Sequence, residues 1–268
     1  MRVKLILGIT DTSRNLPINY QYEFSAWIYK TLHYGDPTFA RWLHDHGYTE
    51  GKRSFKLFSF SNLDVDRFKI NGDRFQIVSD EARLILTFHI DEAIQHFVTG
   101  LFRHNAFTIG DRKSQVDFEV KSVEMLHPPE FTDTMRFRTL SPVCISRPVE
   151  NNGKLTAEYL APGHPEYSRR FFENLLTRYR SSQQQYQQLS KSFELLESSD
   201  NPKSRLIKIK ADTPQETRVR GYLYDFECSA PAELLRFGYE AGFGEKNSLG
   251  FGCVEVIKLL ESSKLSKS

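Results

Sequence analysis

The sequence His127-Pro128-Pro129, near the middle of this 268-residue chain, constrains the fold more than any other segment. Proline lacks a backbone N–H and its ring fixes φ, so two consecutive prolines disfavour the continuation of a helix or a strand. A chain of this length is long for one domain and suffices for two of about 125 residues each. We therefore expect one domain at residues 1–127 and a second at residues 128–260, followed by a frayed Ser- and Lys-rich tail at residues 261–268.

The apolar pattern on both sides of this break predicts strands that alternate with helices. Asp36 and Pro37 suit the N-cap and the first position of a short helix, which Gly47 ends. Asp91 suits the cap of a later helix, and Asn71-Gly72 indicates a hairpin. The expected helices lie at residues 20–32, 36–43, 91–102, 165–180 and 232–239, with a Gln-rich extension or loop at 181–188. The expected strands lie at residues 3–7, 55–60, 67–70, 74–78, 82–90, 107–109, 116–125, 135–140, 143–147, 206–210, 219–228 and 253–259.

The order of these elements is compatible with β-α-β-β-α-β in each half. It predicts an α+β fold of two tandem ferredoxin-like, or RRM-like, domains. No repetition of sequence is visible between the halves, so this prediction depends on element order.

Charge and cysteine usage limit the classes of function. The net charge is only +2, so a site for a polyanion must come from local clusters of Lys and Arg. Cys144, Cys228 and Cys253 are widely spaced and lack the CxxC pairing of a zinc site, which fits small buried residues in a reducing cytoplasm. No apolar stretch approaches the ~20 residues that cross a bilayer, and no secretory signal is visible. We expect a soluble, cytoplasmic protein without membrane contact.

The most specific segment is the glycine-rich loop at residues 238–252, with two Gly-Phe-Gly units around a turn that carries Lys246. Glycine allows backbone N–H groups to approach phosphates closely. A Rossmann fingerprint requires glycine at Asn247, and a Walker loop requires glycine at Glu245 before the lysine, so neither motif is present. A bulged hairpin remains the alternative. The loop residues that we expect to contact RNA are Gly242, Gly244, Lys246, Asn247, Gly250 and Gly252.

Gly-hydrophobic-Gly, five residues, and Gly-hydrophobic-Gly near the C-terminus resembles the signature of CRISPR-associated endoribonucleases that process precursor CRISPR RNA, the sixth Cas family of the RAMP superfamily. The N-terminal half carries weaker landmarks in the same order, at Leu16–Tyr20, Ile28-Tyr29, Trp42–His44 and Lys56–Ser61. The resemblance implies two ferredoxin-like domains and one cut without a metal or other cofactor. CRISPR repeat RNA would be the partner, and other Cas proteins of an effector complex or a second copy of the chain are further candidates.

Cleavage of RNA can use its own 2′-hydroxyl as nucleophile, which leaves a 2′,3′-cyclic phosphate and a 5′-hydroxyl. The family's Tyr/His/Lys set matches three positions: His44 as general acid or base, Tyr29 to orient the 2′-hydroxyl, and Lys56 to stabilise the phosphorane. Lys52 or Arg53 could reach the same phosphate. The alternatives are that His44 complements a helix dipole, as His46 could, and that Tyr29 is an ordinary amphipathic-helix residue.

Strand alternation places further cations in pairs beside an aromatic side chain, a combination that suits phosphates and a stacked base. A solvated sheet face is the alternative for any single pair. These predicted RNA contacts are Arg136, Arg138, Lys208, Lys210, Arg218, Arg220 and Tyr222. For the whole chain, the alternatives to an endoribonuclease are a catalytically silent RAMP-type protein that binds CRISPR RNA, and a small-molecule enzyme that binds a nucleotide at the glycine-rich loop.

Overall fold

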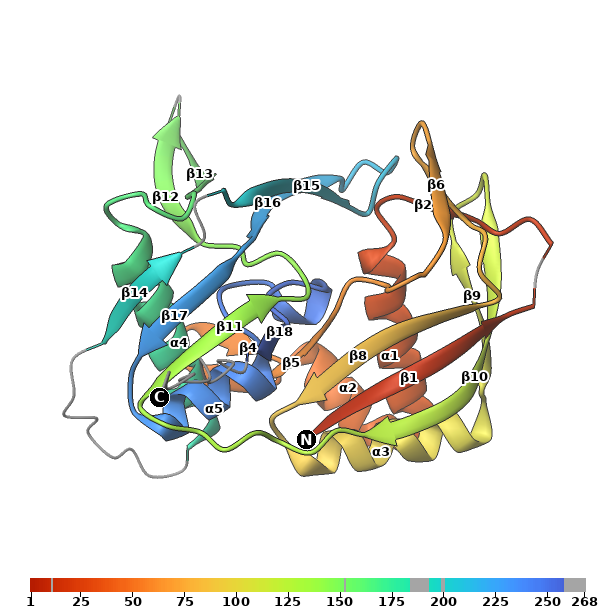
Figure 1. Cartoon of the computed structure of the whole chain (residues 1–268), viewed down its shortest axis with the longest axis horizontal. Helices are drawn as coiled ribbons and strands as arrows, with labels where there is room; N and C mark the ends of the chain where they lie inside the picture. Colours follow the sequence, from red (N-terminus) through yellow and green to blue (C-terminus); the bar gives the residue numbers. More distant parts are fainter. Residues whose placement is uncertain (11, 152, 184–192, 199–200, 258–268) are drawn as a thin grey trace, which may run out of the picture.

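The computed structural model describes residues 1–10, 12–151, 153–183, 193–198 and 201–257. Residues 184–188 of the Gln-rich run, the end of the last expected strand and the predicted tail lie outside these ranges. Figure 1 shows an α+β protein in which two antiparallel sheets lie side by side, one in each half of the chain. None of the described helices is long and apolar enough to cross a membrane.

The sheet of the N-terminal half has five strands in the order β5-β8-β1-β10-β9. Val3, Leu5 and Leu7 alternate along β1 and are fully buried, because this face of the sheet packs against α1 and α3. The strands are β1 (Arg2–Ile9), β5 (Phe58–Phe60), β8 (Glu81–Phe88), β9 (Ala106–Gly110) and β10 (Gln115–Met125). The helices are α1 (Gln21–Gly35), α2 (Pro37–Asp45) and α3 (Asp91–Arg103).

The sheet of the C-terminal half has four strands in the order β14-β17-β11-β18. Phe171 of α4 and Leu234 of α5 pack with Phe137 and Phe226 of the sheet in a second hydrophobic cluster. The strands are β11 (Thr134–Thr139), β14 (Glu194–Ser198), β17 (Asp225–Ser229) and β18 (Val254–Val256), and the helices are α4 (Tyr167–Ser182) and α5 (Ala232–Ala241). When the four main strands of each half are numbered in chain order, they lie in the order 2-3-1-4 across the sheet. This order is β5-β8-β1-β10 in the N-terminal half and β14-β17-β11-β18 in the C-terminal half.

Smaller ribbons connect and flank the two sheets (Figure 1). They comprise β2 (Asn15–Pro17) with β7 (Arg74–Ile77) and β6 (Phe68–Asn71); β3 (Tyr48–Glu50) with β4 (Arg53–Phe55); β12 (Ser146–Asn151) with β13 (Lys154–Tyr159); and β15 (Lys203–Ile209) with β16 (Thr217–Leu223). The short 3₁₀ helix η1 (Asn247–Leu249) lies within the glycine-rich loop.

Several local predictions are confirmed. The side chain of Asp36 accepts a hydrogen bond from the Phe39 N–H at 2.8 Å and so caps α2, with Pro37 in the first position. Gly47 follows the helix with a φ of +66°. The Asn71-Gly72 hairpin joins β6 to β7. All three cysteines are free and buried.

Other predictions are wrong in detail. The strand expected at residues 55–60 is broken, because Leu57 adopts a φ of +53° and its side chain joins the hydrophobic cluster of the other half. The strand expected at 219–228 divides into β16 and β17, which pair in different sheets. Val143 forms only an isolated bridge with Tyr222, and β12 begins at Ser146. Asp91 is the first residue of α3, and its side chain does not cap the helix.

Candidate active site

The three residues expected to be catalytic lie together, although separate elements carry them. Tyr29 belongs to α1, His44 to the last turn of α2, and Lys56 to the segment between β4 and β5. The Tyr29 and His44 rings meet edge to face with their centroids 5.3 Å apart. The Lys56 ammonium donates a hydrogen bond to the backbone carbonyl of His44 at 2.7 Å.

Local sequence explains this convergence. Asp36 is extended, so the chain reverses between α1 and α2 and His44 returns beside Tyr29. At Gly47 the chain turns again into β3 and β4, where a Cβ atom would lie 2.5 Å from the Phe55 carbonyl. The ribbon returns Lys56 to the C-terminal end of α2, where backbone carbonyls lack helical partners.

The surroundings of Tyr29 and Lys56 affect whether these side chains carry a proton. Burial raises the pKa of Tyr29 well above its usual range, and a side-chain hydrogen bond with Ser248 of the glycine-rich loop opposes this only partly. The phenol is therefore protonated near neutral pH. Partial burial lowers the pKa of Lys56, while the Asp45 carboxylate acts in the opposite direction. The His44 side chain is 69 % exposed, which leaves its ring accessible to a long polymer.

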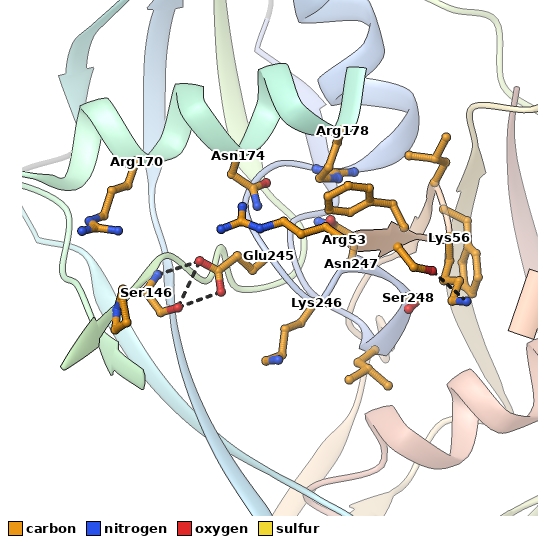
Figure 2. Close-up of a pocket in the computed structure, with 16 residues that line it drawn as sticks. Arg53, Lys56, Ser146, Arg170, Asn174, Arg178, Glu245, Lys246, Asn247 and Ser248 are labelled. Atoms are coloured by element: carbon orange, nitrogen blue, oxygen red, sulfur yellow. Dashed lines mark hydrogen bonds between the residues drawn. The ribbon is translucent and has the colours of Figure 1, made fainter. Parts of the chain in front are cut away.

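A cavity of about 480 Å³ lies beside Lys56 and is lined by both halves of the chain (Figure 2). Arg53 and Lys56 enter it from the N-terminal half, and Lys246 and Ser248 enter it from the glycine-rich loop. Neither Arg53 nor Lys246 forms an ion pair with any acid in the described part of the chain. Lys246 adopts a left-handed conformation with a φ of +60°, which is uncommon for a residue other than glycine.

Helix α4 supplies three further residues of this cavity that the sequence analysis missed: Arg170, Asn174 and Arg178. They are spaced at i, i+4 and i+8, and such a row of polar residues on one helix face was the available signal. Arg178 is buried and donates to the carbonyls of Ala241, Gly242 and Gly244 at 2.5, 2.7 and 3.2 Å, so it anchors the glycine-rich loop. Burial alone lowers its pKa.

The acids near the cavity are already engaged. Glu245 accepts hydrogen bonds from the Ser146 N–H at 2.9 Å and from the Ser146 hydroxyl at 2.8 Å. Glu166 binds Arg170 at 2.9 Å and also Arg147, and these hydrogen bonds lower the pKa of Glu166 to about 2. Among the described residues that line the cavity, Glu245 is the one acid beside five cations (Arg53, Lys56, Arg170, Arg178 and Lys246), so the charge of the cavity suits a phosphate group.

The glycines of the loop serve packing within the protein. A Cβ atom at Gly244 would lie 2.6 Å from the Cys144 carbonyl, and one at Gly250 would lie 2.8 Å from the Phe60 ring. The buried Asn247 amide donates to the carbonyls of Phe243 and Phe251 at 2.9 and 3.2 Å. A side chain at Gly244 or Gly250 would therefore meet atoms of the protein itself, whether or not RNA is bound. RNA contact by the loop stays a prediction.

The other predicted RNA contacts lie apart from this cavity. Arg138 forms a two-pronged ion pair with Asp225, with N–O distances of 3.0 and 2.9 Å. Lys208 and Arg218 both face Glu216, at 3.9 and 3.2 Å. Lys210 contacts Gln215 at 3.4 Å and lies over the Tyr22 ring, Arg220 contacts Ser204 at 2.9 Å, and Tyr222 forms a backbone bridge with Val143. No ion pair is formed by Arg136 or Lys52 within the described residues.

Within the described ranges, no group of three or more His, Cys, Asp or Glu side chains could hold a metal ion.

Comparison with known proteins identifies the same family in both halves. Residues 15–124 match the model described as CRISPR-associated protein Cas6, N-terminal, and residues 126–256 match the one described as CRISPR associated protein Cas6, C-terminal. The CRISPR-associated endoribonuclease Cas6 1 of Methanocaldococcus jannaschii is 29% identical, over 95% of this chain and 92% of that protein. A CRISPR-associated endoribonuclease-like Cas6 protein of Pyrococcus furiosus is 28% identical, over 96% of this chain and 99% of that protein.

A solved structure agrees with these matches. A RAMP protein described as binding different RNA substrates superimposes with a TM-score of 0.80 at 26% identity, and the match covers 96% of this chain and all of that one.

Proposed function

The chain belongs to the Cas6 family of CRISPR-associated RAMP proteins, and we propose that it is an endoribonuclease that cuts CRISPR repeat RNA once, without a metal ion. The observation that carries this proposal is the convergence of Tyr29, His44 and Lys56 beside a cationic cavity. These three residues were expected from the sequence at separate positions, and their proximity in the structure supports a joint role at one phosphate.

The reaction is an internal transfer at one phosphodiester. The 2′-oxygen loses its proton and bonds to phosphorus, the bond to the 5′-oxygen breaks, and that oxygen takes up a proton. The products are a 2′,3′-cyclic phosphate and a 5′-hydroxyl. His44 serves as general acid or base, and a positioned group in this role contributes about 10²–10⁴-fold to the rate.

The other two side chains assist at the same phosphate. The protonated phenol of Tyr29 donates a hydrogen bond that orients the 2′-hydroxyl. Lys56 stabilises the negative charge that develops on the phosphorane, a role that charge-assisted hydrogen bonds perform well.

The cavity beside Lys56 binds the RNA backbone next to the scissile phosphate. Arg53 and Lys246, which lack ion pairs with described acids, contact phosphates there, and Lys52 at the β3–β4 turn extends the positive surface. Arg170 and Asn174 line the opposite wall. The RNA therefore contacts both halves of the chain.

The scaffold of this site is two tandem ferredoxin-like domains, at residues 1–127 and 128–260. The support is the strand order that the two sheets share: numbered in chain order, the four main strands of each half lie in the order 2-3-1-4. Two helices pack on one face of each sheet.

The second candidate function is a catalytically silent protein that binds CRISPR RNA. One contact favours it: the hydrogen bond from Lys56 to the His44 carbonyl would also serve as a cap for α2. The relative from P. furiosus that is described as endoribonuclease-like fits this candidate as well.

Cleavage of repeat RNA in EDTA separates the two functions. We expect one cut per repeat with a 2′,3′-cyclic phosphate on the upstream product, because the nucleophile belongs to the RNA. Mapping both product ends checks this. Binding without cleavage would support the silent module, and activity that only a divalent ion restores would contradict the metal-independent mechanism.

A further inference from the structure

His44 is in contact with a carboxylate that has no role in the mechanism above. Its Nδ1 atom lies 2.8 Å from Oδ1 of Asp45, the next residue in the chain. Adjacent helix positions diverge by about 100°, so such neighbours seldom face each other within a helix. Here the pair forms at the last residue of α2. Tyr29 on one side and Asp45 on another therefore determine how the imidazole lies.

The surroundings of Asp45 are otherwise cationic. The small cavity at Tyr29 and His44 is lined by Lys30 and His33 of α1 and by Arg41 of α2, and Asp45 is the one acid among its described lining residues. His46 and Lys56 also act on this carboxylate electrostatically. The hydrogen bond from His44 is the main cause that lowers the pKa of Asp45, so the side chain is charged at neutral pH.

The helix end and the RNA both disfavour a negative charge at this position, whereas the neighbouring cations favour it within the folded protein. The C-terminal end of a helix carries a partial negative charge, which disfavours an acidic residue in the last turn. A carboxylate beside the scissile phosphate also repels the RNA. Affinity for RNA therefore does not account for Asp45, whereas its directed hydrogen bond to His44 gives it a defined contact in the site.

We propose that Asp45 is a positioning residue for His44. By accepting a hydrogen bond from Nδ1–H, it holds the imidazole in the tautomer whose Nε2 atom is free to exchange a proton with the RNA. A carboxylate that orients a catalytic histidine is a recurrent arrangement, and loss of such a supporting group often costs about 10–100-fold in activity. This inference rests on the proposed function, because His44 must be the proton-transfer group.

Asp45→Ala and Asp45→Asn test the proposal, with single-turnover cleavage and RNA affinity measured separately. We expect Asp45→Ala to slow cleavage about 10–100-fold, while its affinity for repeat RNA is unchanged or tighter because a negative charge is gone. Asp45→Asn should recover part of the rate, since its amide oxygen can still accept from Nδ1–H. Asp36→Asn is the matched control: it removes the same charge from α2, and asparagine caps a helix as well as aspartate.

Nitrogen NMR of the His44 ring provides a readout that does not depend on activity. The wild-type protein should show the neutral ring with its proton on Nδ1, and Asp45→Ala should shift the population toward Nε2–H. Slower cleavage with unchanged or tighter affinity, together with this tautomer shift, supports the inference. Wild-type cleavage by Asp45→Ala, or a parallel loss of affinity and rate, overturns it.

The two proposals fail in distinguishable ways. If the wild-type protein binds repeat RNA but does not cut it, the proposed activity is wrong, and the tautomer comparison still decides whether Asp45 orients His44. An unchanged tautomer in Asp45→Ala would contradict the positioning role whether or not the protein cuts RNA.

Discussion

Two cations of the cavity and two cations of the β11 and β15–β16 surfaces have the same formal charge but different surroundings. Arg53 and Lys246 face the cavity without an ion pair to any acid that the structure describes. Arg138, by contrast, is bound by Asp225, and Arg218 faces Glu216. A carboxylate beside an arginine weakens the field that a phosphate meets, even where the exposed pair itself contributes only about 0–1 kcal/mol. In a chain with a net charge of +2, cations that share a cavity and form no ion pair with a described acid indicate the polyanion site better than the number of cations.

The largest expected effect is on the cleavage rate, and it distinguishes the catalytic role of His44 from RNA binding by the cations. His44→Ala should slow cleavage about 10²–10⁴-fold, because the proton-transfer group is lost. Its affinity for repeat RNA should stay within a few fold, since cations and phosphates supply most of the binding. Single-turnover kinetics and a binding titration check both parts. The control is His46→Ala, two residues further along, which should cut at nearly the wild-type rate.

The next effect distinguishes packing from RNA contact in the glycine-rich loop. Gly244→Val should lower the free energy of unfolding by ~2–5 kcal/mol, because the positive φ of +69° disfavours a side chain and the Cβ atom meets the Cys144 carbonyl. Gly51→Val is matched in backbone, with a φ of +58°, but its Cβ atom enters open space. It should lose only ~1–2 kcal/mol. Equal losses in urea titrations would show that the loop glycine is not constrained by packing.

The smallest expected effect is on RNA affinity, and it tests the comparison between the cations of the cavity and those of β11. Lys246→Ala should weaken RNA binding by up to about fivefold, as expected for one exposed charged contact. It should also reduce the salt dependence of log K by about 0.7, the value for one phosphate contact on a single strand. Arg138→Ala should change affinity less than about twofold, because Asp225 already holds that side chain. If Arg138→Ala has the larger effect, the RNA follows the sheet and not the cavity.

Local sequence signals were sufficient for elements whose ends depend on their own residues. Asp36 and Pro37 began α2 as expected, and Gly47 followed its end with a positive φ. The convergence of Tyr29 and His44 could be anticipated from the family resemblance. It could not be derived from periodicity, which relates only residues on the same element.

The failures occur where distant parts of the chain decide the conformation. Leu57 interrupts a predicted strand because its side chain packs in the cluster of the other half. Strand β14 was missed because its pairing with β17, across about thirty residues of intervening chain, determines it and its own sequence alternates poorly. The α4 wall of the cavity was missed because the polar row on this helix marks a face but does not indicate that the face lies opposite β4.

The most direct test of the central claim uses a repeat RNA with a single 2′-deoxy substitution just 5′ of the scissile phosphate. The wild-type protein should bind this RNA with nearly unchanged affinity and leave it uncut, because the nucleophile is missing. Normal cleavage of the deoxy substrate would mean that water attacks the phosphate, and the mechanism at Tyr29, His44 and Lys56 would be wrong.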